Sequence, residues 1–83
     1  MSPERPGPSR PTLASLRVGS RLRVSEVDGG HAQELLREGV LPGAIVRVAS
    51  RTPLGGPVII VLGRSRLALS ADVAASVRGE ALG

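Results

Sequence analysis

The stretch ELLREGVLPG (residues 34–43) joins the end of an amphipathic helix to a stop made of two glycines and a proline. Only glycine takes the left-handed backbone conformation without steric cost, so Gly39 is expected at the C′ position that ends the helix. Val40 then stands at C″, which in a Schellman motif packs against the helical position C3, here Leu35. We therefore expect Val40 to fold back onto the helix instead of facing water.

Directly after this stop, LPGA (residues 41–44) fits a type II turn, because Pro42 stands second and Gly43 third. The turn aims the chain into a strand at Ile45, where a run rich in β-branched residues begins. Leu41 remains as the one apolar residue of the stretch without a structural role. Two interpretations stay open: Leu41 is buried against the rest of the fold, or it is offered to a partner.

The segment before this stretch predicts a turn, a strand and the helix itself. TLASL (residues 12–16) resembles a single helical turn with Thr12 as its cap. RLRVSEV (residues 21–27) alternates arginine with apolar residues and then loses phase, which predicts a strand with either a bulge or its end near Ser25–Glu26. HAQELLRE (residues 31–38) carries one narrow apolar stripe of helical spacing. Two turns are not stable alone, so this helix must lean on the rest of the fold.

The second half of the chain predicts a hairpin and a short helix. VIIVLG (residues 58–63) is apolar throughout and of strand length, so we expect both of its faces to be covered. RSRLALS (residues 64–70) follows after a tight connection and forms a hairpin with it. Ser70 can cap a helix in ADVAASV (residues 71–77), and the residues from 78 onward add a last short strand and then fray.

These patterns together predict a mainly β fold. A single small sheet leaves two edges exposed, and closure into a barrel removes them. We therefore expect a small, partly open β-barrel with a two-turn helix inserted after the first strand and a short C-terminal helix. The chain of 83 residues allows one small domain. The expected organisation is a disordered, proline-rich arm over residues 1–11, the barrel over residues 12–78, and a frayed tail over residues 79–83.

The composition excludes several classes of protein. An apolar content of 41% with 22% charged residues is that of a globular chain, and the lack of cysteine excludes disulfides and thiolate metal sites. The sequence has neither an apolar run of about 18 residues nor the apolar core of a secretory signal. We expect a cytoplasmic protein without direct membrane insertion.

The groups that could carry chemistry are few. The single histidine, His31, lies near Ser25 and Asp28, but nothing in the pattern supplies a catalytic triad with its oxyanion site. His31, Asp28 and Glu34 could approach one another on one helical turn. A stable metal site usually needs three or four convergent ligands, and a helix start with favourable charges explains these residues as well. We expect no enzyme activity, no metal site and no cofactor.

Nucleic-acid binding is the main alternative function. The net charge is +4, and Arg47, Arg51, Arg64 and Arg66 fall on neighbouring strands or their loops, where they could cluster. Binders of single strands usually add aromatic stacking platforms, and this sequence contains no aromatic residue. A solvated arginine face therefore competes with an RNA- or DNA-binding barrel as the interpretation.

Several motifs occur in a fixed order that resembles a known family. VLPG (residues 40–43) follows a short helix with two leucines, PLGGP (residues 53–57) precedes an apolar strand, and RLALS (residues 66–70) precedes a short alanine-rich helix. From about Thr12 to Val77 this order resembles the FeoA family of ferrous iron transport proteins. The resemblance implies an SH3-like β-barrel, similar to the C-terminal module of iron- and manganese-dependent repressors.

The same resemblance implies a partner. FeoA-family proteins are small cytoplasmic accessories of FeoB, the membrane ferrous-iron transporter with a GTPase domain, which implies a role in iron homeostasis through protein–protein interaction. Leu41, Leu54 and Arg51 are the candidates for contact with that partner, and a weak homo-oligomer is a further option. Backbone geometry is a sufficient account of the turn residues, which are Gly39, Pro42, Gly43, Pro53, Gly55 and Pro57.

Overall fold

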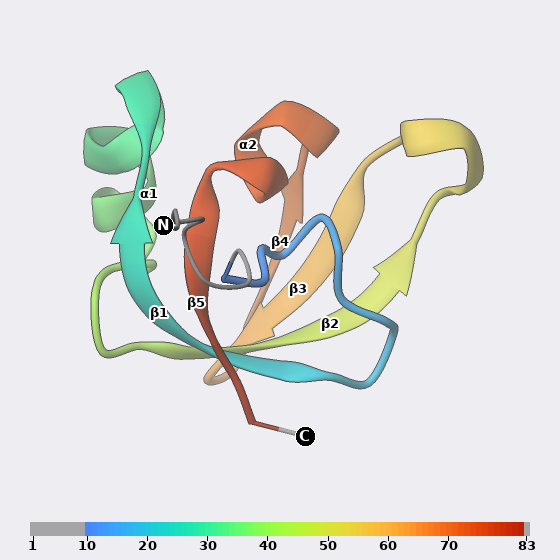
Figure 1. Cartoon of the computed structure of the whole chain (residues 1–83), viewed down its shortest axis with the longest axis horizontal. Helices are drawn as coiled ribbons and strands as arrows, with labels where there is room; N and C mark the ends of the chain where they lie inside the picture. Colours follow the sequence, from blue (N-terminus) through green and yellow to red (C-terminus); the bar gives the residue numbers. More distant parts are fainter. Residues whose placement is uncertain (1–9, 83) are drawn as a thin grey trace, which may run out of the picture.

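A computed structural model describes residues 10–82, so most of the arm expected over residues 1–11 lies outside this part of the chain. The described residues form one antiparallel sheet of five strands in the order β4-β3-β2-β1-β5, with two short α-helices (Figure 1). The elements are β1 (Arg21–Val27), a 3-10 turn (Gly29–His31), α1 (Ala32–Arg37), β2 (Ile45–Arg51), a 3-10 turn (Pro53–Gly55), β3 (Val58–Leu62), β4 (Ser65–Leu69), α2 (Ala71–Ala75) and β5 (Val77–Ala81). The expected mainly β fold with one helix inserted after the first strand is confirmed.

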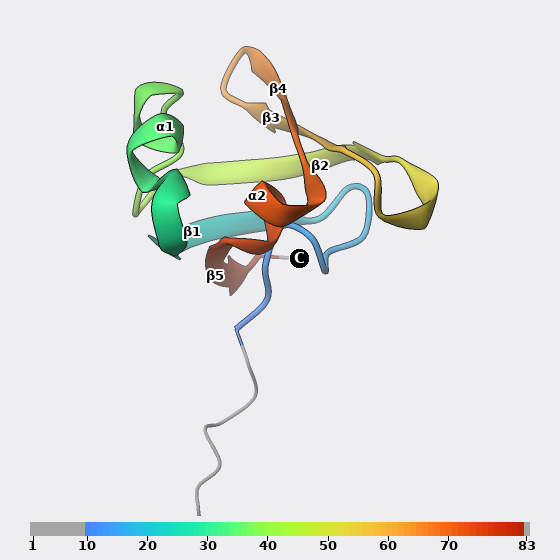
Figure 2. The ribbon, with the colours of Figure 1, turned by 90° about the horizontal axis from the view of Figure 1, so that it is seen from above.

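The sheet curls into a partly open barrel. β5 pairs with β1, whereas β4 pairs only with β3 among the described residues, and α2 links β4 to β5 across the opening. Figure 2 shows α1 at one end of this arrangement and the β2–β3 connection at the other. The two short helices therefore border a sheet whose two edge strands, β4 and β5, do not pair.

Aliphatic side chains alone build the core. Among residues 10–82 it holds twelve buried residues, drawn from the segment before β1, all five strands, both helices and the cap of α1: Leu13, Leu22, Val24, Leu35, Val40, Val46, Val48, Val58, Ile60, Leu69, Ala74 and Val77. β1 and β2 each bury alternate residues, and for β1 the sequence alternation predicted this. Burial of each such side chain contributes about 1.5–3 kcal/mol, so α1 is held chiefly by Leu35 and its capping valine.

The predicted bulge in β1 is confirmed. The register of β1 against β5 shifts between Val24 and Glu26, which leaves Ser25 as the additional residue. A second shift, between Val48 and Ser50, gives β2 a bulge that the sequence did not predict. Both bulges bend their strands, which a small sheet needs in order to curl.

Two sequence predictions concern the segments before and after the barrel. TLASL forms the predicted single turn: the amide of Ser15 donates to the carbonyl of Thr12 over 3.1 Å, and Oγ1 of Thr12 caps the turn by accepting from the amide of Ala14 over 3.1 Å. Thr12 also bridges to Arg78 of β5, a contact that the sequence did not predict. The tail expected from residue 79 is ordered as far as Leu82, because β5 runs to Ala81 and the amide of Leu82 donates to the carbonyl of Arg21 over 2.9 Å.

The expectation for β3 is only half right. Val58 and Ile60 are buried, but the alternate residues Ile59 and Val61 are half-buried on the outer face. The helices of the described chain border the opening of the barrel and leave this outer face of β3 without a covering element. An unbroken apolar run indicates a strand here but does not show that a second layer covers it.

Candidate partner-binding groove

The end of α1 has the geometry that its sequence predicts. Gly39 has a φ of +95°, and its amide donates to the carbonyl of Leu36 over 3.0 Å. The amide of Val40 donates to the carbonyl of Leu35 over 2.9 Å, and both of these side chains are buried. These bonds form the Schellman motif, and they confirm that Val40 packs on the helix.

The next residues form the predicted turn and are tied to β1. The amide of Ala44 donates to the carbonyl of Leu41 over 2.9 Å, and Gly43 has a φ of +96°, as a type II turn requires. The amide of Gly43 and the carbonyl of Ala44 both bond to the backbone of Val24, each over 2.8 Å. The turn is therefore fixed against β1 just before its bulge, and this fixes the position of Leu41.

Leu41 lines an apolar groove between α1, the bulge of β1 and the turn after the helix. The groove has a volume of about 350 Å³ and is lined by Ser25, Glu26, Val27, Ala32, Gln33, Leu36, Val40, Leu41 and Pro42. Leu36 and Leu41 are 54% and 38% exposed. The stripe expected on α1 is thus divided: Leu35 enters the core, while Leu36 faces the groove. Leu41 is therefore not buried in the core; it is partly exposed at a concave apolar surface.

Leu54 occupies a different part of the molecule. It is fully exposed, at 104%, and it is the one non-glycine residue of the described chain with a positive φ, +65°. Leu41 precedes β2 and Leu54 follows it, so the two side chains lie at opposite ends of that strand (Figure 2). Leu54 is therefore not buried in the barrel, and it lies apart from Leu41.

The third predicted contact residue, Arg51, has a role within the chain that the sequence did not indicate. Its guanidinium donates to the carbonyl of Leu16 over 2.6 Å and to the carbonyl of Ala14. These two bonds fasten the loop before β1 to the end of β2, although 35 residues separate Arg51 from Leu16 along the chain. No local pattern signals such a contact, because it depends on the position of a distant loop.

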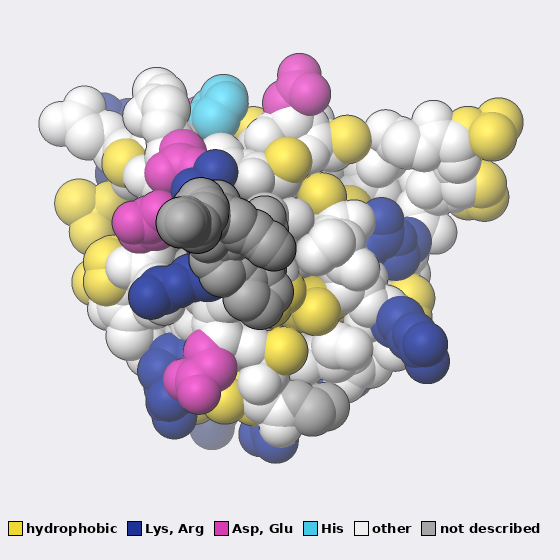
Figure 3. All heavy atoms as spheres, in the orientation of Figure 1, with side chains coloured by type: hydrophobic (Ala, Val, Ile, Leu, Met, Phe, Trp, Pro, Cys, Tyr) yellow, Lys and Arg dark blue, Asp and Glu magenta, His cyan; other side chains and the backbone are white. Residues whose placement is uncertain are grey.

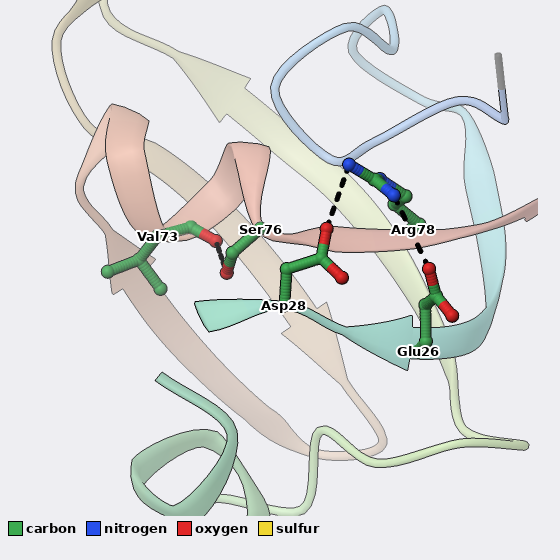
Figure 4. A network of polar contacts seen from close by, with 5 residues as sticks. All are labelled: Glu26, Asp28, Val73, Ser76 and Arg78. Carbon is green, nitrogen blue, oxygen red and sulfur yellow. Dashed lines mark hydrogen bonds and ion pairs between the residues drawn. The ribbon is translucent and has the colours of Figure 1, made fainter. Parts of the chain in front are cut away.

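The residues considered for catalysis or metal binding either pair with other side chains or lie apart from one another. Asp28 forms an ion pair of 2.8 Å with Arg78, and Glu26 approaches the same guanidinium at 3.4 Å (Figure 4). His31 lies in the 3-10 turn before α1 and is half-buried. Over residues 10–82, no three His, Asp or Glu side chains are grouped so that they could hold a metal ion. Asp28 therefore neutralises an arginine of β5 in this structure.

The structure separates the four arginines that the sequence grouped together. Arg47 and Arg66 both stand opposite Val61, one on each neighbouring strand, so they lie on the same outer face of the sheet. Arg64 lies in the connection between β3 and β4, and Arg51 is bonded to the loop before β1. The register adds Arg21, which stands directly opposite Arg47 and which the sequence reasoning left out.

A comparison with protein families decides which family this barrel represents. The model of the FeoA domain matches residues 12–81. The chain belongs to the FeoA family. Members of this family are SH3-like proteins associated with ferrous iron transport. The SH3-like barrel and the link to ferrous iron transport that the sequence implied are thereby confirmed.

Solved structures of FeoA proteins have the same fold. An iron uptake regulatory protein (FeoA) is 33% identical, with a TM-score of 0.77 over 86% of this chain and 96% of that one. FeoA of Stenotrophomonas maltophilia, solved with zinc and described as a prokaryotic SH3 domain protein, is 28% identical, with a TM-score of 0.72 over 83% of this chain and 88% of that one. Among curated protein sequences, none matches this chain significantly.

A further similarity concerns the fold alone. A manganese-dependent transcriptional repressor superposes with a TM-score of 0.74 at 20% identity, over 93% of this chain and 44% of that one. The FeoA-family barrel thus matches a part of a longer protein, in agreement with the similarity to repressor modules that the sequence implied. Among residues 10–82, neither helix has the length and apolar character needed to span a bilayer.

Proposed function

We propose that this FeoA-family chain is a cytoplasmic accessory module of ferrous iron uptake that binds the GTPase domain of an FeoB-type membrane transporter. The observation that carries the proposal is the groove of about 350 Å³ in which Leu36 and Leu41 are both exposed. Membership of a family associated with ferrous iron transport supports the choice of partner.

The groove suits a protein ligand that inserts one or two apolar side chains. Its walls are mainly aliphatic, and Glu26, Gln33 and Ser25 supply polar groups among its lining residues. Protein interfaces commonly combine such an apolar centre with a polar surround. Burial of an exposed leucine contributes up to about 1.5–3 kcal/mol, so the two leucines supply enough free energy to matter in a complex of modest affinity.

The rigidity of the groove favours binding without rearrangement. Leu41 precedes a turn whose next residues bond to Val24, and Leu36 belongs to a helix whose end is closed by the Schellman motif. A partner therefore finds both leucines already in place, and little conformational entropy is lost when it binds.

Leu54 is proposed as a second, separate contact. A leucine in the left-handed conformation costs about 1–2 kcal/mol of conformational free energy. Because the side chain of Leu54 is fully exposed, no hydrophobic burial offsets this cost. Strained residues persist in loops mainly where they serve a function. In this proposal Arg51 acts indirectly, because it holds the adjoining end of β2 against the loop at Leu16.

The test measures binding of the purified chain to the isolated GTPase domain by titration calorimetry. In the variant Leu36→Ser/Leu41→Ser we expect affinity to fall at least tenfold, since more than about 1.4 kcal/mol of apolar burial is lost. Val18→Ser is the matched control, because Val18 is 56% exposed and lies outside the groove. The single variant Leu54→Ser tests the second contact separately.

Three outcomes would contradict the proposal. The folded chain could fail to bind the GTPase domain at high micromolar concentration, or the double variant and Val18→Ser could bind equally well. The third outcome is tested by sedimentation equilibrium of the chain alone, which shows whether the chain forms a dimer. A dimer that Leu36→Ser/Leu41→Ser dissociates and Val18→Ser leaves intact would assign the groove to a second copy of this chain.

A further inference from the structure

The charges of this chain are divided between two parts of the sheet. From Gly39 to Ala71 the sequence contains no Asp or Glu, and it contains four arginines. β2, β3 and β4 all lie in this interval, so these three neighbouring strands carry no carboxylate. In Figure 3 the acidic side chains gather toward the left and the top of the view, whereas the basic side chains at the right have no acidic neighbour.

Three arginines form a row across the outer face of these strands. Arg21 of β1 stands opposite Arg47 of β2, Arg47 stands opposite Val61 of β3, and Val61 stands opposite Arg66 of β4. Strands are spaced by about 4.8 Å, so the row spans roughly 14 Å from Arg21 to Arg66. All three arginines are exposed, and none forms an ion pair with a carboxylate of residues 10–82.

The row of arginines lowers the stability of the sheet unless an anion neutralises it. Like charges directly opposite each other on antiparallel strands are destabilising, and Arg21 and Arg47 are such a pair. By contrast, Arg23 on the same face of β1 is paired with Glu80 over 2.9 Å. The fold thus supplies a carboxylate to the arginine beside β5 and supplies none to the row.

Apolar side chains share this outer face with the arginines. Ile45 is 46% exposed, and Ile59 and Val61 are half-buried between β2 and β4. The solvated face of an antiparallel sheet normally carries polar residues at these positions. Long arginine side chains thus project from a partly apolar face, where their guanidinium groups are free to meet anions.

We propose that this outer face, with Arg21, Arg47 and Arg66 as its contacts, docks on the surface of an anionic lipid bilayer. Arginine binds phosphate through two parallel N–H···O bonds, and a charged bilayer surface offers many phosphates in one plane. A nucleic acid fits less well, since single-stranded ligands need stacking platforms and the chain has no aromatic residue. None of the three arginines lines the groove, so the two surfaces consist of different residues.

The experiment is co-sedimentation of the purified chain with vesicles. Vesicles made of equal amounts of phosphatidylglycerol and phosphatidylcholine are compared with vesicles of phosphatidylcholine alone, at low and at physiological salt. We expect binding to the anionic vesicles only, weakening as salt rises. Each basic residue near such a surface contributes a factor of about five, so Arg21→Gln/Arg47→Gln/Arg66→Gln should lower the partition coefficient roughly a hundredfold.

The matched control removes the same net charge elsewhere. Arg10→Gln/Arg17→Gln/Arg37→Gln changes three exposed arginines outside the strands and should retain most of the binding. Equal loss in the two triple variants, or no binding of the folded chain at low salt, would overturn the proposal. Tighter binding to short single- or double-stranded oligonucleotides than to the vesicles would overturn it in favour of a nucleic acid. The test contains no transporter, so its result is independent of the groove.

Discussion

Gly39 lies so close to Leu62 that a Cβ atom added to the glycine would stand 3.0 Å from Cδ2 of that leucine. The end of α1 therefore approaches the β3–β4 hairpin at a residue that has no side chain. The same glycine provides the positive φ on which the Schellman motif depends. One residue thus sets both the end of the helix and its distance from the sheet.

Substitution Gly39→Ala should lower the free energy of unfolding by about 2 kcal/mol, because alanine in the left-handed conformation is strained and its methyl group presses on Leu62. Urea denaturation followed by circular dichroism measures the change. Gly30→Ala is the control, since Gly30 has no positive φ and no atom within 4 Å of an added Cβ. Equal stability of the two variants would show that neither strain nor contact acts at Gly39.

Substitution Arg51→Met should release the loop before β1, because the carbonyls of Ala14 and Leu16 lose their charged donor. We expect a loss of about 1–2 kcal/mol in unfolding free energy. The loop itself offers a second readout, since trypsin cleaves after Arg17 and should do so faster in the variant. Arg47→Met is the control, with a change within about 0.5 kcal/mol. Unchanged cleavage in Arg51→Met would contradict the anchoring role.

Substitution Gly79→Ala should force β1 and β5 apart, because the added Cβ would stand 1.9 Å from the carbonyl oxygen of Arg23. Backbone atoms cannot yield as a flexible side chain does, so we expect a loss of about 3 kcal/mol or more. Thermal denaturation measures it. Glu80→Ala, which removes only an exposed ion pair next to Gly79, should cost less than about 1 kcal/mol. A mild effect of Gly79→Ala would mean that the two strands tolerate a wider spacing.

Substitution at Leu54 should separate stability from binding. Leu54→Gly removes the strain of a positive φ and should leave the unfolding free energy unchanged or raise it by up to about 1 kcal/mol. Leu54→Val should lower it by about 1 kcal/mol, because a β-branched residue fits this conformation worse. If Leu54 is a partner contact, Leu54→Gly weakens binding to the GTPase domain while the barrel stays folded. A destabilised Leu54→Gly would refute the account of strain.

The features that sequence reasoning predicted depend on short-range rules. The Schellman motif at Gly39, the type II turn at Gly43 and the bulge at Ser25 each follow from a few adjacent residues. The cap of α2 is of the same kind, since Ser70 accepts from the amide of Val73 over 3.3 Å. Such features are readable because the residues that determine them are neighbours in the chain.

The features that it missed depend on contacts between distant segments. Leu36 has a helical spacing suited to the core, yet the fold covers only Leu35, and the sequence cannot say how wide the buried stripe is. Arg21 joined the arginine row only once the register of β1 against β2 was known. The role of Arg51 likewise required the position of a loop 35 residues away. Of the residues that line the groove, the sequence therefore predicted Leu41 as a contact, and the structure showed which residues surround it.

The two ends of the described chain both lie beside β5. The amide of Gly79 donates to the carbonyl of Pro11 over 3.1 Å, and Leu82 follows three residues later along the same strand. At about 3.4 Å per residue the two attachment points are roughly 10 Å apart. β5 contributes no residue to the groove and none to the arginine row. This barrel can therefore be joined to other segments of a polypeptide at two neighbouring points beside β5, away from the groove, as a portable unit.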